Sequence, residues 1–417
     1  MIVLINLNSY LGGGETLMVR MAQFLSKTER EFCCVCARDG YIHKDLINND
    51  IRNCIALEKE DIDYYYMNDD QRLSVLSKMK MALPASKEYT FVTFLMRDLY
   101  MVSQLTKEIP HSKVVHLVLH YQDNLYVSQS VKDKFVKRYF HKEKYSRKRQ
   151  IAFNRMLFNK LCDNDAIIPM GDLMVNYWTK CFDIHLKSEN VVSLPTADFP
   201  ESIDFPKENN HKIIFIGRIV DFKIPALCVM LNYINRHKEY SLTVVGDGDM
   251  LFIDNYIEQH HIDRSRIHFI GQVDYNKLGN VIKEHSIGYA MGTSVIEICK
   301  QGLPAVMALS NPNHKLYERD ICGGLYANCV RGNVGDNLFA GESQDDQPLL
   351  EDVMTQLENN YEASAKACYE YIKSDYGLTH NMNRYLEIIV KARSTDFSDV
   401  EIPHATCIRK FLFKHFN

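Results

Sequence analysis

Three groups of residues in the second half of the chain have residue types and a spacing that are typical of a binding site for a phosphate-bearing ligand. The first is Gly217-Arg218, at the end of an apolar run, with Lys223 five residues after the arginine. Glycine permits a tight turn, and two cations just beyond it neutralise a diphosphate, to which arginine adds a two-pronged hydrogen-bond geometry. A surface pair of cations at a helix start would oppose the helix dipole, so the sequence favours a binding role.

The second group is Gly246-Asp247-Gly248-Asp249. It has the form of an acid-x-acid metal motif, but we favour a strand-to-helix turn in which glycine supplies the unusual φ and aspartate caps the next helix. We therefore predict no metal ligands here. Gly246 and Gly248 would still let a ligand approach the backbone closely.

The third group is Gly292-Thr293-Ser294, followed by Glu297. A strand ends here, a turn of small residues exposes N–H groups, and a helix begins, which makes an anion site. We expect Glu297 in the first turn of that helix, where it either accepts hydrogen bonds from ribose hydroxyls or merely complements the helix dipole.

The elements that must position these groups alternate between short apolar runs and amphipathic stretches, which predicts parallel sheets covered by helices. In the first half we expect a helix over 15–26 and strands over 2–7, 32–37, 91–95, 114–119 and 165–169. In the second half we expect strands over 212–216, 241–245, 267–270, 286–290 and 304–308. The helices expected there span 224–235, 250–260, 275–283 and 294–300, followed by 349–359, 363–374 and 380–392.

Pro195, Pro200 and Pro206 interrupt any regular element between the two halves. We therefore predict an N-terminal Rossmann-like domain over 1–195 and a C-terminal one over 196–375. A crossover helix and a basic tail fill 376–417.

Composition limits the function further. The net charge of −4 argues against a general nucleic-acid binder. The N-terminus lacks the pattern of a signal peptide, and no apolar run is long enough for a membrane span. The twelve cysteines indicate reduced core thiols, so we expect a cytoplasmic protein.

The second half also resembles a known family. The runs "FIGRIVDFK", "VVGDGD", "IHFIGQVDYNKL" and "GTSVIEICKQGLPAV" are similar in order and spacing to the donor domain of retaining GT-B glycosyltransferases of family 4. "NLNSYLGGGETLMVRMAQFL" resembles the family's opening strand, glycine loop and helix. The resemblance implies an α/β GT-B fold, with two Rossmann-like domains facing across a cleft and a C-terminal helix packing back on the N-terminal domain.

The resemblance also implies roles for single residues. Arg218 and Lys223 would bind the donor diphosphate next to Gly217, Thr293 and Ser294 would contact phosphate, and Glu297 would hold the ribose. Gly271 and Gln272 would lie beside the nucleobase, and Gly13 and Gly14 near the transferring sugar. His120 resembles the active-site histidine that contacts the donor sugar, although a strand-end histidine is also often structural.

One position departs from the family pattern. The first glutamate of the paired motif falls eight residues before Glu297, where this chain has Tyr289. That residue usually faces the sugar, so the substitution affects donor-sugar handling. The implied reaction is transfer of a hexose or related sugar with retention, without a metal, a cofactor or a protein nucleophile.

A basic segment from Lys132 to Arg149 holds nine Lys or Arg and two acids, with aromatic residues interleaved. It predicts either a solvated helix face or contact with an anionic membrane, and the tail 409–416 would add a second contact. With the family's acceptor domain at the N-terminus, this favours a glycan or polyprenyl-diphosphate-linked acceptor. The protein would then be peripheral on the inner face of the plasma membrane, in surface polysaccharide (O-antigen or capsule) biosynthesis.

Other functions stay open. A sugar-nucleotide epimerase or phosphorylase can use the same fold, and a non-catalytic nucleotide- or glycan-binding relative would explain Tyr289. A nicotinamide or methyl-donor enzyme is disfavoured, because Gly12-Gly13-Gly14 does not complete G-x-G-x-x-G when position 17 is Leu17.

Overall fold

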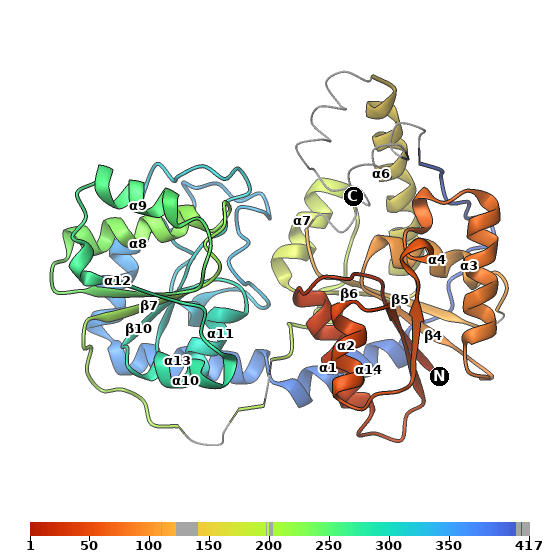
Figure 1. The fold of residues 1–417 in the computed structure, drawn as a ribbon, viewed down its shortest axis with the longest axis horizontal. Helices are drawn as coiled ribbons and strands as arrows, with labels where there is room; N and C mark the ends of the chain where they lie inside the picture. Colours follow the sequence, from red (N-terminus) through yellow and green to blue (C-terminus); the bar gives the residue numbers. More distant parts are fainter. Residues whose placement is uncertain (110, 122–140, 197, 200–202, 406–409, 411–417) are drawn as a thin grey trace. The chain divides into compact units, whose positions relative to one another are not determined.

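A computed structural model describes residues 1–417 except 110, 122–140, 197, 200–202, 406–409 and 411–417 (Figure 1). Within these residues the chain forms two compact units. Unit 1 contains 1–170, 174–192 and 382–417, and unit 2 contains 171–173 and 193–381. Each unit is built on one parallel sheet of the described residues, as expected from the alternation of strands and helices.

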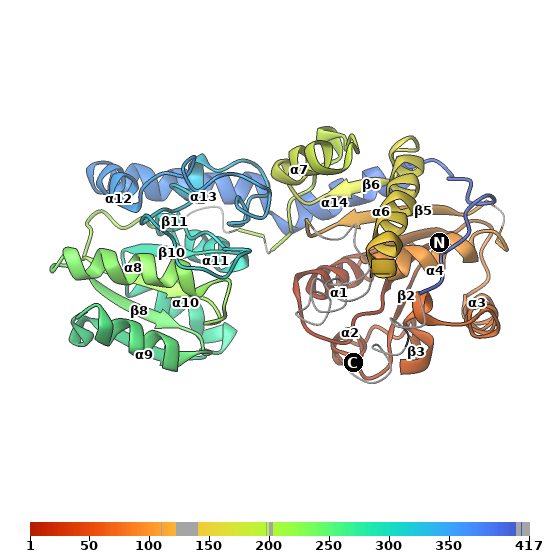
Figure 2. The ribbon, with the colours of Figure 1, turned by 90° about the horizontal axis from the view of Figure 1, so that it is seen from above.

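The sheet of unit 1 has the strand order β3-β2-β1-β4-β5-β6 in the described residues. The strands are β1 (Ile2–Asn6), β2 (Phe32–Ala37), β3 (Cys54–Leu57), β4 (Thr90–Thr93), β5 (Lys113–Val118) and β6 (Ile167–Pro169). The helices are α1 (Gly13–Leu25), α2 (Tyr41–Asn48), α3 (Asp69–Ala82), α4 (Met96–Leu105), α6 (His141–Cys162), α7 (Asp172–Phe182) and α14 (Leu378–Lys391). Figures 1 and 2 show α1 and α2 on one face of this sheet and α4 and α6 on the other.

The sheet of unit 2 has the strand order β11-β10-β7-β8-β9. The strands are β7 (Lys212–Ile216), β8 (Ser241–Val245), β9 (Ile267–Gly271), β10 (Ile287–Ala290) and β11 (Ala305–Met307). The helices are α8 (Ile224–Arg236), α9 (Met250–Gln259), α10 (Tyr275–Lys283), α11 (Thr293–Lys300), α12 (Leu350–Asn359) and α13 (Tyr361–Asp375). Helices α8 and α9 cover one face and α10 and α11 the other (Figure 1), as right-handed crossovers require for this order.

The central strands β2 and β7 are largely apolar because helices cover both faces of their sheets. All six residues of β2 are buried, as are four of the five in β7. A continuous apolar run is typical of a parallel strand between two helix layers. This accounts for the close agreement between the predicted and observed bounds of β2, β7 and β8.

The C-terminal segment after residue 381 packs on unit 1, which confirms the predicted return of the last helix. Tyr385 in α14 donates its hydroxyl to the carbonyl of Val192 at 3.2 Å. Further along, the Arg72 guanidinium donates to the carbonyl of Ile402 at 3.1 Å. The chain therefore passes from unit 1 to unit 2 near residue 193 and returns near residue 381, and the short stretch 171–173 also belongs to unit 2.

Candidate functional site

The predicted donor residues of unit 2 lie at the carboxyl ends of neighbouring strands. Strand β7 pairs with β10 on one side and with β8 on the other, and Ile216 lies opposite Ala290. The strand order therefore reverses direction at β7, and ligands bind α/β sheets at such a point. The loop after β7 carries Arg218 and Lys223, and the loop after β10 carries Gly292.

Arg218 and Lys223 form a pair of like charges in that loop. Arg218 is exposed, and Lys223 is partly buried as the N-cap of α8. A Cβ atom at Gly217 would lie 3.6 Å from the Lys223 Nζ, so the lysine folds back over the end of β7. Burial lowers the Lys223 pKa, and so does the positive charge of Arg218, whereas Asp336 opposes the shift.

Neither cation forms an ion pair with an acid in the described residues. Lys223 is the N-cap of α8, where the helix dipole disfavours positive charge. A bound anion would relieve both unfavourable interactions at once, because it supplies the missing negative charge. The geometry therefore supports the predicted phosphate role of this pair.

Gly246 and Gly248 follow β8 and hold the loop that carries Arg218. Their φ angles are 131° and 153°, in the region that favours glycine. A Cβ at Gly246 would lie 2.2 Å from the Gly217 carbonyl oxygen, and one at Gly248 would lie 1.9 Å from that of Ile219. The sequence suggested that these glycines leave room for a ligand, but the backbone of the β7 loop occupies that space.

Asp249 has a structural role through its side chain, and Asp247 contributes a hydrogen bond through its backbone carbonyl. The Asp249 side chain accepts the Phe252 N–H at 3.1 Å and caps α9, which confirms the capping interpretation. The Asp247 carbonyl accepts the N–H of Ile219 at 2.8 Å. No group of three His, Cys, Asp or Glu side chains in the described residues is placed to hold a metal ion.

The start of α11 offers the N–H groups that the sequence predicted. Gly292 adopts a φ of 69°, and a Cβ at this position would meet nothing within 4 Å. Thr293 is exposed, Ser294 is partly exposed, and no side chain caps the helix. An uncapped helix N-terminus that borders open space leaves N–H groups that can bind an anion.

Glu297 lies beyond the first turn of α11, so the prediction that placed it within the first turn is wrong. A purely dipolar role is correspondingly weak, because the effect falls off after the first turn. Instead, its Oε1 accepts a hydrogen bond from the Tyr275 hydroxyl at 2.9 Å. Gly271 ends β9 with a φ of 69°, and the exposed Gln272 follows it in the loop before α10.

Tyr289 does not face a ligand. It lies within β10 and is 0% exposed, and its ring packs near that of Phe215. Its hydroxyl has no hydrogen-bond partner among the described residues. The position eight residues before Glu297 therefore belongs to the core, and a glutamate there would be buried.

The remaining predicted residues lie in unit 1. Gly13 and Gly14 open α1, and a Cβ at Gly14 would lie 3.0 Å from the Leu119 Cδ1, whereas one at Gly13 would meet nothing within 4 Å. Gly14 thus permits close packing, while Gly13 borders open space. His120 follows β5, is exposed, and lies edge-to-face with Tyr121.

Two buried carboxylates that the sequence did not single out hold the loop between β1 and α1. Asp98 in α4 accepts the N–H groups of Leu7 at 3.3 Å and Leu95 at 3.1 Å. Glu15 in α1 accepts the side-chain amide of Asn8 at 2.9 Å. Glu15 could have been recognised from its position directly after the glycine loop. No feature of the sequence around Asp98 indicates its role.

Asp98 makes the stability of unit 1 depend on pH. Burial raises its pKa to about 7, against the opposing charge of Arg97 and the N–H groups of Leu7, Leu95 and Phe94. The folded chain therefore keeps a proton that the unfolded chain releases. This contribution to stability is fully present below about pH 3.8 and is lost as the pH rises to about 7.

Asp98 by itself should lower the free energy of unfolding of unit 1 by about 2 kcal/mol between pH 5 and pH 8, whereas the buried His116, whose pKa burial lowers to about 3, should raise it over the same range. Asp98→Asn should remove the Asp98 contribution and leave a rise in stability with pH, whereas Asp50→Asn, at an exposed aspartate, should keep the wild-type dependence. Trp178 is the single tryptophan of the chain and lies buried in unit 1, so its fluorescence during urea unfolding measures the effect. An equal slope in wild type and Asp98→Asn would contradict the assignment.

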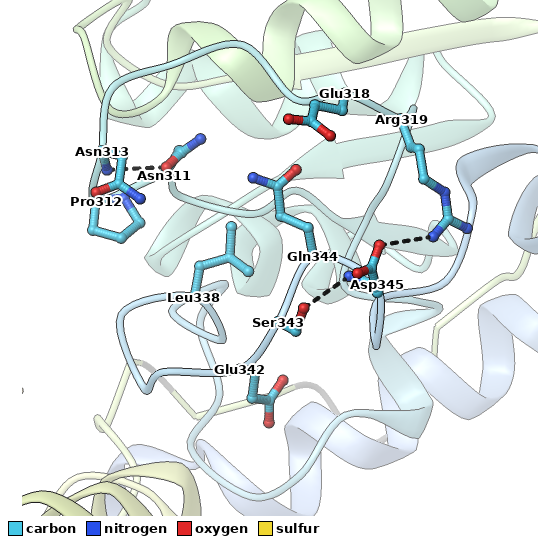
Figure 3. Close-up of a pocket in the computed structure, with 10 residues that line it drawn as sticks. All are labelled: Asn311, Pro312, Asn313, Glu318, Arg319, Leu338, Glu342, Ser343, Gln344 and Asp345. Carbon is cyan, nitrogen blue, oxygen red and sulfur yellow. Dashed lines mark hydrogen bonds and ion pairs between the residues drawn. The ribbon is translucent and has the colours of Figure 1, made fainter.

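A polar cavity of about 370 Å³ is lined by residues of the chain segment that connects β11 to α12 (Figure 3). Its walls include Glu318, Arg319, Glu342 and Asp345, and the Arg319 guanidinium lies 3.6 Å from the Asp345 carboxylate. None of the predicted site residues lines it. It adjoins the β7 loop, since the N–H of Asn311 in its wall donates to the Phe222 carbonyl at 2.9 Å. Such walls suit a hydroxyl-rich group better than an apolar one.

The predicted membrane contacts fall largely outside the described residues. Residues 132–140 of the basic segment are not described, and its remaining part begins α6. Of the tail 409–416, only Lys410 is described. No helix in the described ranges combines the length and apolar character that a membrane span requires.

Comparisons with known proteins identify the fold. No protein-family model matches the chain, and no curated protein sequence matches it. Among solved structures, HepE of Anabaena in complex with UDP-glucose matches with a TM-score of 0.58 and 13% identity, over 93% of this chain and 99% of that chain. A glycosyltransferase from Rickettsia africae ESF-5 matches with a TM-score of 0.61 and 11% identity, over 93% and 97%.

The lipopolysaccharide outer core galactosyltransferase WaaB, in its apo form, matches with a TM-score of 0.58 and 11% identity, over 93% of this chain and 98% of that chain. These matches extend over nearly the whole chain and include both units. They confirm the predicted GT-B fold. At such low identities they establish the fold alone.

Proposed function

We propose that the chain is a glycosyltransferase whose nucleoside-diphosphate sugar donor binds at the carboxyl edge of the sheet of unit 2. The observation that carries this proposal is the cation pair Arg218 and Lys223, which lies without an acidic ion-pair partner in the described residues at the point where the strand order reverses. The uncapped N-terminus of α11 belongs to the adjacent strand loop and adds N–H donors. The fold shared with HepE, solved with UDP-glucose, supports this proposal.

The reaction breaks the bond between an anomeric carbon and the diphosphate, which leaves negative charge on the departing group. Arg218, Lys223 and the α11 N–H groups would stabilise that charge because they are held in place before the reaction. We propose retention of configuration by same-face attack, as in family 4. The departing phosphate would help to deprotonate the acceptor hydroxyl. In this proposal the two cations also replace a divalent ion.

The acceptor in this proposal is a glycan or a polyprenyl-diphosphate-linked sugar that unit 1 binds. The basic, aromatic segment 132–149 would hold the enzyme on the cytoplasmic face of the plasma membrane. Its place would be surface polysaccharide assembly. The local positive charge in a chain of net charge −4 supports this assignment.

Thermal melting with nucleoside diphosphates and their sugars, in EDTA, tests the proposal. A ligand that binds only the folded chain raises the melting temperature, so one diphosphate should stabilise the protein without a metal. Product analysis with that donor then separates transfer to an acceptor from epimerisation, which requires no acceptor. If no nucleotide raises the melting temperature, the non-catalytic alternative replaces the proposal.

We expect His120→Ala to lower turnover about a hundredfold, because a misplaced donor sugar costs a factor of that order. Binding of the nucleoside diphosphate should change less than about threefold, since His120 lies in unit 1 and the diphosphate residues lie in unit 2. His185→Ala, at an exposed histidine of unit 1, is the matched control and should leave both quantities unchanged. Steady-state rates and calorimetric Kd values measure the two effects, and full activity in His120→Ala would remove the histidine from the mechanism.

A further inference from the structure

Tyr275 and Glu297 connect two elements of the donor edge through one hydrogen bond. Tyr275 is the first residue of α10, four residues after Gly271 at the end of β9. Glu297 lies in α11, which begins after β10. The Tyr275 hydroxyl donates to the Glu297 Oε1 at 2.9 Å, although the two residues are 22 positions apart.

The Glu297 carboxylate can accept further hydrogen bonds besides the one from Tyr275. The structure assigns no hydrogen-bond partner to the other oxygen, Oε2, among the described residues, and the side chain of Glu297 is partly exposed. An ionised carboxylate has about four acceptor positions, of which the tyrosine takes one. Two adjacent hydroxyl groups can therefore donate to Glu297 while Tyr275 keeps its bond.

The backbone under Glu297 is held firmly. Val295, Ile296, Ile298 and Cys299 of α11 are all buried, so the helix is fixed against the core of unit 2. The Glu297 side chain, in contrast, can rotate unless another group holds it. Tyr275 is the group that holds it in this structure.

The distance along α11 between Thr293 and Glu297 matches the distance between phosphate and ribose in a nucleotide. The rise of an α-helix places Glu297 about 6 Å along the axis from Thr293, whose N–H belongs to the anion site. A ribose diol lies at about this separation from the nearer phosphate of a nucleoside diphosphate. A phosphate at the start of α11 would thus bring the ribose to Glu297.

We propose that Tyr275 is a positioning residue that fixes the Glu297 carboxylate toward the 2′- and 3′-hydroxyls of the donor. This inference rests on the proposed function and adds a residue that orients the carboxylate of its ribose contact. The donor is a ribonucleotide, and 2′-deoxy donors bind more weakly because one hydroxyl is missing. Fixing the acceptor before binding reduces the ordering cost of each hydrogen bond.

Substitution of Tyr275 tests the inference directly, because its side chain contributes little to the core. Its side chain is 61% exposed, so Tyr275→Phe removes the hydroxyl with little change in burial. Tyr371→Phe is the matched control, since it also removes a tyrosine hydroxyl bond in unit 2, to the Val330 carbonyl at 3.0 Å. It should leave every nucleotide affinity unchanged.

Calorimetric Kd values are measured for UDP, GDP and ADP and for the 2′,3′-dideoxy form of each. For the ribonucleotide that binds, Tyr275→Phe should raise Kd about five- to tenfold, which is within the range of one ordinary hydrogen bond, because the Glu297 contacts to the ribose remain but lose their fixed orientation. For its dideoxy form, Tyr275→Phe and wild type should have the same Kd. Glu297→Gln should lower ribonucleotide affinity and abolish the effect of Tyr275→Phe, because the two residues act through one contact.

The outcomes separate this inference from the proposed function. Equal losses for ribose and dideoxy ligands would mean that Tyr275 acts only on the structure of the site and would overturn its positioning role. An unchanged Kd for the ribonucleotide in Tyr275→Phe would overturn it as well. If the wild type binds none of the diphosphates, both the proposed function and this inference are wrong.

Discussion

The double variant Arg218→Ala with Lys223→Ala is expected to bind nucleoside diphosphates at least about a hundredfold more weakly than the wild type. Hydrogen bonds to charged groups contribute about 1.5–3 kcal/mol each, and the variant removes two cations that would contact the diphosphate. A factor of one hundred corresponds to about 2.7 kcal/mol, so the estimate is a lower bound. Isothermal calorimetry in EDTA, with the diphosphate that stabilises the wild type, measures the change.

The fold should tolerate this double variant. Arg218 is exposed, Lys223 is the N-cap of α8, and neither joins an ion pair in the part of the chain described. Removal of positive charge from a helix N-terminus is neutral or slightly stabilising. Lys238→Ala with Lys283→Ala is the control, because it removes two exposed cations of the same unit and should not change binding. Equal affinities for the double variant and this control would place the diphosphate elsewhere.

The variant Tyr289→Glu is expected to destabilise unit 2 by at least about 4 kcal/mol, although it restores the paired glutamates of the family pattern. The side chain lies within β10 with no exposed surface, so the carboxyl group would enter the core without a partner. An unpaired buried charge costs several kcal/mol, and the shorter side chain also leaves a cavity. No gain in sugar transfer is expected.

The matched control is Tyr289→Phe, which removes only a hydroxyl that has no hydrogen-bond partner in the described structure. Its stability should lie within about 1 kcal/mol of the wild type. Urea unfolding followed by far-UV circular dichroism reports both units, whereas Trp178 fluorescence reports unit 1 alone. A loss in the dichroism transition without a shift in fluorescence is the expected pattern. A stable, active Tyr289→Glu would show that β10 presents this position to the donor.

Much of the fold followed from local patterns. The runs over β2, β7 and β8 predicted these strands with their observed bounds, because most of their residues are apolar and buried, and turn residues follow each run. Strand β3 (Cys54–Leu57) was missed. It has four residues at the edge of its sheet, three of them only partly buried, so its sequence lacks the long apolar run of the central strands.

The candidate site also has parts that the sequence predicted and parts that it did not. Gly217, Arg218 and the turn at Gly292 were recognisable because each combines a strand end with residue types suited to an anion. The close approach of Gly246 and Gly248 to the β7 loop depends on which strands are neighbours, and the sequence does not state this. The same holds for Asp98, which contacts Leu7 only because β4 lies beside β1.

The surroundings of Tyr289 and Tyr275 could not be predicted from the sequence. Counting residues back from Glu297 identified Tyr289 as the sugar-facing position of the family that the sequence resembles. However, the strand continues to Ala290, and the core of unit 2 that packs on β10 buries the side chain. Tyr275 had no motif of its own, and only packing of α10 beside α11 brings its hydroxyl to Glu297. The sequence by itself determined the elements and the chemical groups at their ends, because periodicity and turn residues are local. Tertiary structure decided which groups meet, because strand order and burial depend on contacts between distant segments.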